Sequence, residues 1–504
     1  MELLDSNNSN DAEKANSKVE TDASVVNGAT AAGDVAGNDN KMGLLSCTSY
    51  VISNIIGSGI FITPSGVLQE VNSVGLSIII WIGCGIISLL GAIVYIELGT
   101  SILEPGCDFA YLCYVKWSSV AFAFMWVGVL LTYPASVAVQ AVTFGRYIVE
   151  GFAPIYKPEP AYETVVVKVN FFPALIIWIN FHSLGEFVSK FQIAATFAKL
   201  GSMGLIILAG FYWIFVKGNV SPDLKKPFEN SNWHMINIIL AFYSGLWSYA
   251  GWDILNYGTT ELRNPRRNMP LSLIGGITVV SLIYTAINIA YFAVLPVHEF
   301  QTSDAVAASF SQRVFGKFSY AIPFMVAILI CGTLNSNIFC ASRYMHAAAK
   351  ERHLPPFISC INEKTGSPRP SLFLQGILAM IMTFVDVNTL ISYVSFIMFF
   401  QRIFTMLALL YIRLAKIPVY QGAIRLPLSL TILFLLVNIV LVSIPLVQDF
   451  KMTAIGVMFM LTGFLIYYLL VEPSSLPEIF DAINGNILKL TTRRLRDDLN
   501  TSRS

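Results

Sequence analysis

The sequence predicts an all-helical membrane protein whose chain crosses the bilayer twelve times. Of its 504 residues, 55% are hydrophobic and 12% are charged, whereas soluble domains carry about 25% charged residues. Apolar runs long enough to span the hydrocarbon core as a helix, which takes about 20 residues, recur from residue 44 to residue 471. Lys and Arg are more numerous in sum in the connections of one side than in those of the other, which sets the orientation of the spans.

The twelve expected spans form one membrane domain, residues 42–471. They are 44–69, 74–100, 119–149, 165–183, 190–216, 235–258, 271–295, 319–345, 371–386, 389–413, 427–447 and 452–471. Residues 1–41 are polar and rich in Asn, Ser, Ala and Asp, so we expect a disordered tail without a cleavable signal. Residues 472–504 form a second polar tail.

The basic residues predict that both tails are cytoplasmic. This orientation places the two most basic connections, 261–270 and 343–369, on the inner side of the membrane, where Lys and Arg accumulate. The connection 217–234, which would face outward, also carries three lysines. The asymmetry therefore holds for the sum of the connections and not for each one.

The first span contains the stretch "NIIGSGIF", residues 54–61, whose Gly57, Ser58 and Gly59 are poor helix formers. A helix that is interrupted within the hydrocarbon core exposes backbone N–H and C=O groups, which need partners from protein or a cavity. The freed N–H groups suit a carboxylate and the freed carbonyls suit an ammonium group. The alternative is that the two glycines only allow another helix to approach closely.

The sixth span shows a similar interruption. It reads "AFYSGLWSYAGWDILNYGTTE", residues 241–261, with Gly245, Ala250 and Gly251 among aromatic residues and Asp253 directly after them. Interrupted helices at corresponding positions of two halves are typical of a transport site. The pair of interruptions therefore favours binding over packing.

Five motifs carry a resemblance to a known family. They are "NIIGSGIF" (54–61), "YSGLWSYAGWDILNY" (243–257), "TTEL" (259–262), "NPRRNMPLS" (264–272) and "SRYMHAAAKERHLP" (342–355). In this order they resemble the light-chain subunits of the heteromeric amino-acid transporters. These are L-type exchangers of the amino acid–polyamine–organocation superfamily. The resemblance runs from residue 43 to residue 471. It implies a plasma-membrane transporter with a LeuT-like fold, two inverted five-helix repeats plus two extra helices, in which helices 1 and 6 are discontinuous.

The resemblance also implies which residues bind an amino acid. The backbone around Gly57, with the amides of Ser58 and Gly59, resembles the cradle for the substrate carboxylate. The carbonyls of Ile55, Trp247 and Ala250 resemble the acceptors for the α-ammonium group, and Trp247 resembles an aromatic gate. Trp252 is expected to pack in the bundle, as aromatic residues do.

Two charged residues lie within spans. Lys199, in "FAKLG" of the fifth span, stands where sodium-coupled relatives place a sodium ion, which implies exchange without sodium. It could equally cap freed carbonyls of the first helix. Asp253 resembles the "GWD" of y+L-type exchangers, which take cationic and neutral substrates, whereas Ala250 favours neutral ones. The alternative for Asp253 is a helix cap or an ion pair.

The tenth span offers Phe396 and Phe399 as an aromatic pocket wall, which suits large or aromatic substrates. Arg402 lies near the middle of the same span, where the family pattern is apolar. An acid such as Glu97 is one partner for it, although nothing in the sequence fixes the pair.

The expected partners are amino-acid substrates and the lipid bilayer. The outer connection 150–164 contains no Cys, whereas the family carries one there for a disulfide to a heavy chain. We therefore expect no disulfide-linked heavy chain, and a non-covalent partner is left open. The resemblance implies no cofactor.

Other function classes are disfavoured. The seven cysteines show no CxxC or Cys/His spacing, so no metal site is expected, and no catalytic pair converges within the spans, so we expect no enzyme. The net charge of +1 and the topology exclude nucleic-acid binding. We expect a sodium-independent exchanger of neutral amino acids. The alternatives are a y+L-type cationic/neutral exchanger that uses Asp253, and an amino-acid sensor that does not transport.

Overall fold

The computed structural model describes residues 42–152, 186–350 and 369–471, apart from 105, 219–220, 260–261, 304, 317–318, 320 and 449. All regular secondary structure in these residues is helical, and one isolated bridge joins Met42 to Leu262. Within this described part of the chain, six helices are long and apolar enough to cross a membrane, or seven if one bent pair is a single span. The predicted all-helical, multi-pass class is therefore confirmed.

The predicted spans coincide with a helix or with a broken helix pair, except for 165–183, which lies outside the described residues. The helices are α2 (Leu44–Ile55), α3 (Gly59–Val71), α4 (Val74–Ser101), α6 (Ser118–Val127), α7 (Tyr133–Phe152), α10 (Glu186–Tyr212), α12 (Met235–Ser248), α13 (Ile254–Tyr257), α14 (Pro265–Val294), α17 (Ala321–Lys350), α18 (Arg369–Met382), α19 (Val387–Leu414), α20 (Leu428–Gln448) and α21 (Phe450–Ile466). A π-helical turn, Gly128–Thr132, joins α6 to α7.

Short helices lie in the connections. They are α5 (Asp108–Tyr114), α11 (Pro222–Lys225), α15 (Val297–Thr302) and α16 (Val306–Phe315). The two expected tails, 1–41 and 472–504, lie outside the described residues.

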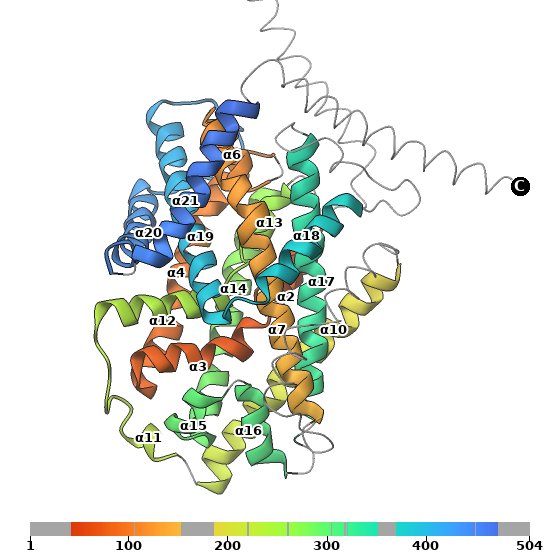
Figure 1. Ribbon diagram of the computed structural model, residues 1–504, viewed down its shortest axis with the longest axis vertical. Coiled ribbons are helices and arrows are strands. Elements are labelled where there is room, and N and C mark those ends of the chain that lie inside the picture. Colours follow the sequence, from red (N-terminus) through yellow and green to blue (C-terminus); the bar gives the residue numbers. More distant parts are fainter. Residues whose placement is uncertain are drawn as a thin grey trace, which may run out of the picture.

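The interrupted helices lie inside the bundle. Helix α14 packs against α2 and α4, α12 packs against α3, and α7 packs against α17 and α18. Helix α20 contacts α19 and α4, and it lies on the opposite side of the molecule from α10 (Figure 1). The broken pair α2–α3 is therefore enclosed by helices from both halves of the chain.

The outer faces of the bundle are apolar. Helix α4 exposes Ile79, Ile82 and Ile86 at helical spacing, and α20 exposes Leu433 and Leu436 among other aliphatic residues. Contiguous apolar surface of this kind is rare on soluble monomers. In a bilayer the same faces contact lipid, and the helices satisfy their own backbone groups.

A buried ion pair joins α4 to α19. One Glu97 oxygen pairs with Nε of Arg413, the other accepts a hydrogen bond from the amide of Leu426 at 3.1 Å, and the Glu97 side chain is 3% exposed. Arg413 also donates to the Leu426 carbonyl at 2.8 Å. The suggestion that Glu97 pairs with Arg402 is therefore wrong, because Arg413 occupies its carboxylate.

We expect Glu97→Gln to destabilise the protein strongly. Removing Glu97 leaves the charge of Arg413 without its partner; because the Arg413 side chain is 25% exposed, we expect a cost of about 2–3 kcal/mol, below that of a fully buried pair. The melting temperature of the detergent-solubilised protein measures the effect. Glu299→Gln is the control, because Glu299 forms a 3.1 Å pair with Arg313 in which both side chains are more than 40% exposed, and exposed pairs contribute about 1 kcal/mol or less. Equal losses in the two variants would contradict the assigned role.

Candidate functional site

The two helix interruptions touch each other. Helix α2 ends at Ile55, α3 begins at Gly59, and their axes are bent by 47°. A Cβ atom on Gly59 would lie 2.6 Å from the Cα of Ser248, the last residue of α12. Gly59 is therefore required for close approach, so the packing interpretation applies to it even though it lies in an interrupted helix.

Hydrogen bonds tie the two interruptions together. The Asn54 side-chain amide donates to the carbonyl of Gly251 at 2.8 Å, and the hydroxyls of Thr63 and Ser248 are 2.6 Å apart. Gly251 has a φ of +93°, in the left-handed region that favours glycine. The chain between α12 and α13 is thus held against α2 by backbone geometry and by one side chain of the "NIIGSGIF" stretch.

Side chains from two other helices bind the carbonyls that the interruptions free. The Tyr284 hydroxyl, on α14, lies 3.0 Å from the carbonyl oxygen of Ile55 and 3.1 Å from that of Ser248, and it can donate to either. The Lys199 ammonium, on α10, donates to the Ser53 carbonyl at 2.9 Å, and Lys199 is 2% exposed. These bonds supply partners that the helix itself no longer offers.

The N-terminus of α3 retains unsatisfied donors. Ser58 occupies the N-cap position without a side-chain capping bond, and its buried hydroxyl has no hydrogen-bond partner among the described residues. The first amides of a helix have no acceptor within the helix. A helix start of this kind is suited to an anion such as a carboxylate.

A cavity of about 520 Å³ lies beside the two interruptions. Its wall includes most of the residues that the sequence predicted: Ile55, Gly57, Ser58, Gly59, Trp247, Ala250 and Asp253. Lys199 is not part of this wall, because it lies behind α2 on the Ser53 carbonyl. The structure therefore brings the backbone residues and Asp253 together at one cavity and keeps Lys199 behind them.

The aromatic wall predicted on α19 is not where the sequence placed it. Phe396 and Phe399 are each 1% exposed and do not line the cavity. Phe396 stacks on Phe400 with ring centroids 6.0 Å apart, and Phe399 stacks on Tyr243 at 5.5 Å. The helix turns Val394, Ile397, Met398 and Gln401 toward the cavity instead. The physical reason is helical phase, because the two aromatics face the core between α19 and its neighbours.

Several residues near the cavity were not selected from the sequence. Asn54 lies within the quoted first motif, so its polar side chain beside the glycines was a usable signal. Tyr284 lies in an apolar run and offers no such signal. Asp108, at the start of α5, lines the cavity together with Asp253, and only the fold brings it there. Trp252 packs in the core as expected, 5.1 Å from the ring of Tyr95.

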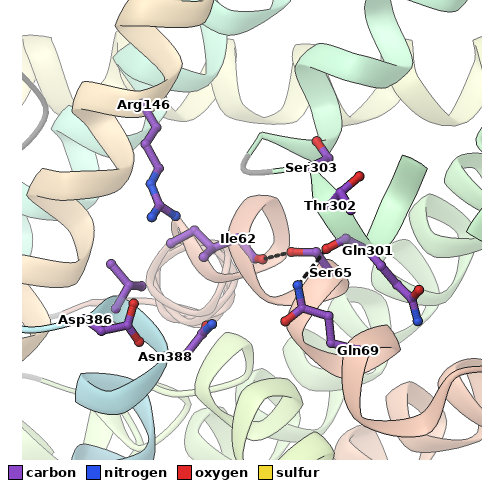
Figure 2. A pocket seen from close by; sticks show the side chains of 10 residues that line it. Ile62, Ser65, Gln69, Arg146, Gln301, Thr302, Ser303, Asp386 and Asn388 are labelled. Atoms are coloured by element: carbon purple, nitrogen blue, oxygen red, sulfur yellow. Dashed lines mark hydrogen bonds between the residues drawn. The ribbon is translucent and has the colours of Figure 1, made fainter. Parts of the chain in front are cut away.

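A second, more polar cavity of about 350 Å³ lies on the other side of α3. Figure 2 shows Arg146, on α7, and Asp386, directly before α19, reaching toward it, with Gln69 and Gln301 opposite Arg146. The Gln69 side chain donates to the carbonyl of Gln301 at 2.6 Å, and Asp386 caps α19 by accepting from the Thr389 amide at 3.1 Å.

An apolar cluster separates the two cavities. Ile62 and Val387 line the polar cavity, whereas Trp247 and Val394 line the larger one. All four belong to one buried cluster that also contains residues of α7 such as Val139. The larger cavity is therefore closed on this side by packed side chains, with the Trp247 ring, 9% exposed, at the boundary.

Comparison with known proteins identifies the family. The family model described as amino acid permease matches residues 42–471, which contain both interruptions and both cavities. The chain belongs to the amino acid permease family.

Its relatives are transporters. Amino acid transporter protein 6 of Caenorhabditis elegans is 45% identical over 440 residues, which cover 87% of this chain and 84% of that protein. The human cystine/glutamate transporter is 35% identical over 451 residues, 89% of each chain. The mouse b(0,+)-type amino acid transporter 1 is 36% identical over 434 residues, 86% of this chain and 88% of that one. The chain is therefore a multi-pass membrane protein of an amino-acid transporter family, and it is not an enzyme.

We expect Gly59→Ala to abolish the native contact between α3 and α12. The added Cβ would meet the Ser248 backbone at 2.6 Å, and backbone cannot move aside as a side-chain tip can. The yield of monodisperse protein in size-exclusion chromatography measures the effect. Gly275→Ala on α14 is the matched control, because nothing lies within 4 Å of its added Cβ and Ala is the better helix former. Equal yields from the two variants would show that the helices are not held at this distance.

Proposed function

We propose that the protein is a sodium-independent exchanger of neutral L-amino acids, with large or aromatic side chains preferred, that works by alternating access. The observation that carries the proposal is the meeting of two interrupted helices at the wall of one cavity. A single cavity then offers unsatisfied amides and freed carbonyls side by side. These are the two complements that the zwitterionic end of an amino acid requires.

In this proposal the start of α3 binds the substrate carboxylate. The amides of Ser58 and Gly59 and the Ser58 hydroxyl donate to it, and Gly57 leaves room for the ligand to approach the backbone. The carbonyls of Ile55, Trp247 and Ala250 accept from the α-ammonium group. Tyr284 already contributes one hydrogen bond to the carbonyl of Ile55, and a carbonyl oxygen has a second lone pair for the ligand. The carbonyl of Trp247 already accepts from the amides of Tyr249 and Ala250, so the ammonium group would share it with them.

Independence from sodium rests on Lys199. Its buried ammonium bonds to the Ser53 carbonyl at the end of α2, where a metal cation would otherwise bind freed carbonyls. A resident positive charge leaves no electrostatic need for a second cation. Both interpretations of Lys199, carbonyl cap and substitute for an ion, thus describe the same contact.

Alternating access would use the two cavities in turn. The cluster around Trp247 keeps the polar cavity apart from the larger one, and a tilt of the helices that carry it would connect them. We further propose a LeuT-like bundle of twelve helices, two inverted five-helix repeats plus two helices, in the plasma membrane. With both termini in the cytoplasm, the polar cavity lies on the outer side.

The protein is proposed to need no disulfide-linked heavy chain. The connection 150–164 contains no Cys, and its residues 153–164 lie outside the described residues. A non-covalent partner remains compatible with this proposal.

One observation favours a second candidate function. Asp253 lines the larger cavity, so its carboxylate could attract a cationic side chain. The second candidate is therefore a y+L-type exchanger of cationic and neutral amino acids.

Uptake of labelled phenylalanine, leucine and arginine into oocytes that express this chain alone tests the proposal. We expect phenylalanine and leucine uptake that is unchanged when choline replaces sodium and that rises when the oocyte is preloaded with amino acid. Arginine uptake comparable to that of leucine would favour the second candidate. Absence of all uptake, with the chain detected at the surface, would reject autonomous transport and leave a non-transporting sensor or a required partner.

We expect Trp247→Ala to reduce uptake at least tenfold without reducing the amount of protein at the cell surface, because the ring closes the boundary between the cavities. Trp233→Ala is the matched control, since Trp233 is 61% exposed in a connection. Surface biotinylation together with leucine uptake separates the two effects. Uptake that falls only in proportion to surface protein would contradict a gating role.

A further inference from the structure

Two carboxylates line the larger cavity next to each other. Asp108 begins α5, and Asp253 lies in the interruption before α13. One carboxylate oxygen from each and the sulfur of Cys107 lie within 4.8 Å of one another. The Asp108 carboxylate also accepts hydrogen bonds from the hydroxyls of Tyr95 and Thr405, so its position is fixed by α4 and α19.

Arg402 lies behind these carboxylates. It is 4% exposed and does not line the cavity. Its guanidinium carbon lies 4.8 Å from the ring centroid of Trp252 and 5.6 Å from that of Phe399. Its Nε has no hydrogen-bond partner among the described residues. The guanidinium is therefore stacked between aromatic rings and is held without a close ion pair to either acid.

The charge of Arg402 acts on both acids. It interacts electrostatically with Asp108 and with Asp253, whereas Glu97, the acid named from the sequence, is occupied by Arg413. A charge buried among apolar side chains is strongly disfavoured unless opposite charge lies nearby. The two carboxylates are the compensating charge that the structure provides.

The acids outnumber the cation at this end of the cavity. Burial and the neighbouring carboxylate of Asp253 raise the pKa of Asp108 to about 6, and hydrogen bonds from Tyr95 and Thr405 and the charge of Arg402 oppose the rise. The two acidic side chains, Asp108 and Asp253, lie beside the single guanidinium of Arg402, so removing Arg402 would leave two carboxyl groups at the cavity wall without a nearby cation among the described residues.

We propose that Arg402 is a specificity-determining residue that favours neutral amino acids. Its positive charge compensates the carboxylates of Asp108 and Asp253, as the cationic side chain of a substrate would otherwise do. The inference rests on the proposed function and deepens it, because it explains how a site that contains Asp253 can favour neutral substrates. Arg402 acts through the two carboxylates and does not touch the substrate.

The inference predicts that selectivity follows the net charge of the three side chains. With Arg402 counted as +1 and Asp108 and Asp253 as −1 each, the wild type carries −1 and Arg402→Met carries −2. Arg402→Lys and the double variant Arg402→Met/Asp253→Asn also carry −1. Asp253→Asn carries 0. The measured quantity is arginine uptake divided by leucine uptake, so losses in folding or turnover cancel. We expect the ratio to rise about tenfold or more in Arg402→Met, equivalent to ~1.4 kcal/mol.

The other variants separate charge from shape. Arg402→Lys keeps the charge, loses the planar guanidinium and should keep the wild-type ratio to within about twofold. Asp253→Asn should give the lowest ratio, below that of the double variant, although both lack the same acid. A merely structural role for Arg402 predicts no such order. If Arg402→Met fails to reach the surface, the comparison of wild type, Asp253→Asn and the double variant still decides.

A second measurement separates this inference from the proposed function. Leucine and arginine each raise the melting temperature of purified protein if they bind, so the same ratio can be read without transport. If the wild type shows no uptake, autonomous transport is rejected. The order of the variants in the melting-temperature shifts caused by arginine and leucine would still test the inference. An unchanged ratio in Arg402→Met, or a ratio in Asp253→Asn equal to that of the double variant, would overturn the counter-ion role.

Discussion

The arrangement depends on one constraint: backbone groups freed inside an apolar bundle must find partners. Two helices are interrupted where they touch, and the hydrocarbon core of a bilayer contains no water that could bond their freed backbone groups. The Tyr284 hydroxyl donates to the carbonyl of Ile55 or to that of Ser248. The Lys199 ammonium donates to the carbonyl of Ser53, and the Asn54 side-chain amide donates to the carbonyl of Gly251. Each of these carbonyls thus has one donor within the protein and keeps a second lone pair, whereas the Ser58 hydroxyl and the start of α3 have no partner among the described residues. The unsatisfied donors at the start of α3 suit an anion.

The same contacts explain why the interruptions cannot be separate features. Gly59 meets Ser248 so closely that a side chain would exclude the contact, and Thr63 and Ser248 share a hydrogen bond. Any movement of α3 therefore carries the end of α12 with it, together with Trp247 at the boundary between the cavities. Substrate binding at the interruptions would act directly on the element that closes the cavity, without a longer path of coupled residues.

The sequence predicted the helices and their two interruptions because both depend on local chemistry. Apolar length locates the spans, and glycines beside polar residues locate the interruptions at Gly57 and Gly251. It failed for Phe396 and Phe399, because each residue along a helix is rotated by about 100° from the one before, so a shift of one residue decides which side chain faces a cavity. An apolar helix such as α19 has no polar stripe to reveal its phase. The sequence also did not reveal that Glu97 pairs with Arg413 or that Asp108 lies beside Asp253. Such neighbours come from helices that are distant in the chain and depend on how the bundle packs.

The two buried basic residues, Lys199 and Arg402, are bound in different ways and so have different effects. Lys199 binds a backbone carbonyl directly, so its charge satisfies the interruption of α2. Arg402 makes no such bond through Nε and is stacked on Trp252, so its charge remains available to the carboxylates at the cavity wall. A buried cation that donates to a freed carbonyl supplies that carbonyl with a partner, whereas one held by aromatic faces contributes to the potential of the space beside it. On the proposed function, selectivity therefore depends on residues behind the cavity wall as well as on those that line it.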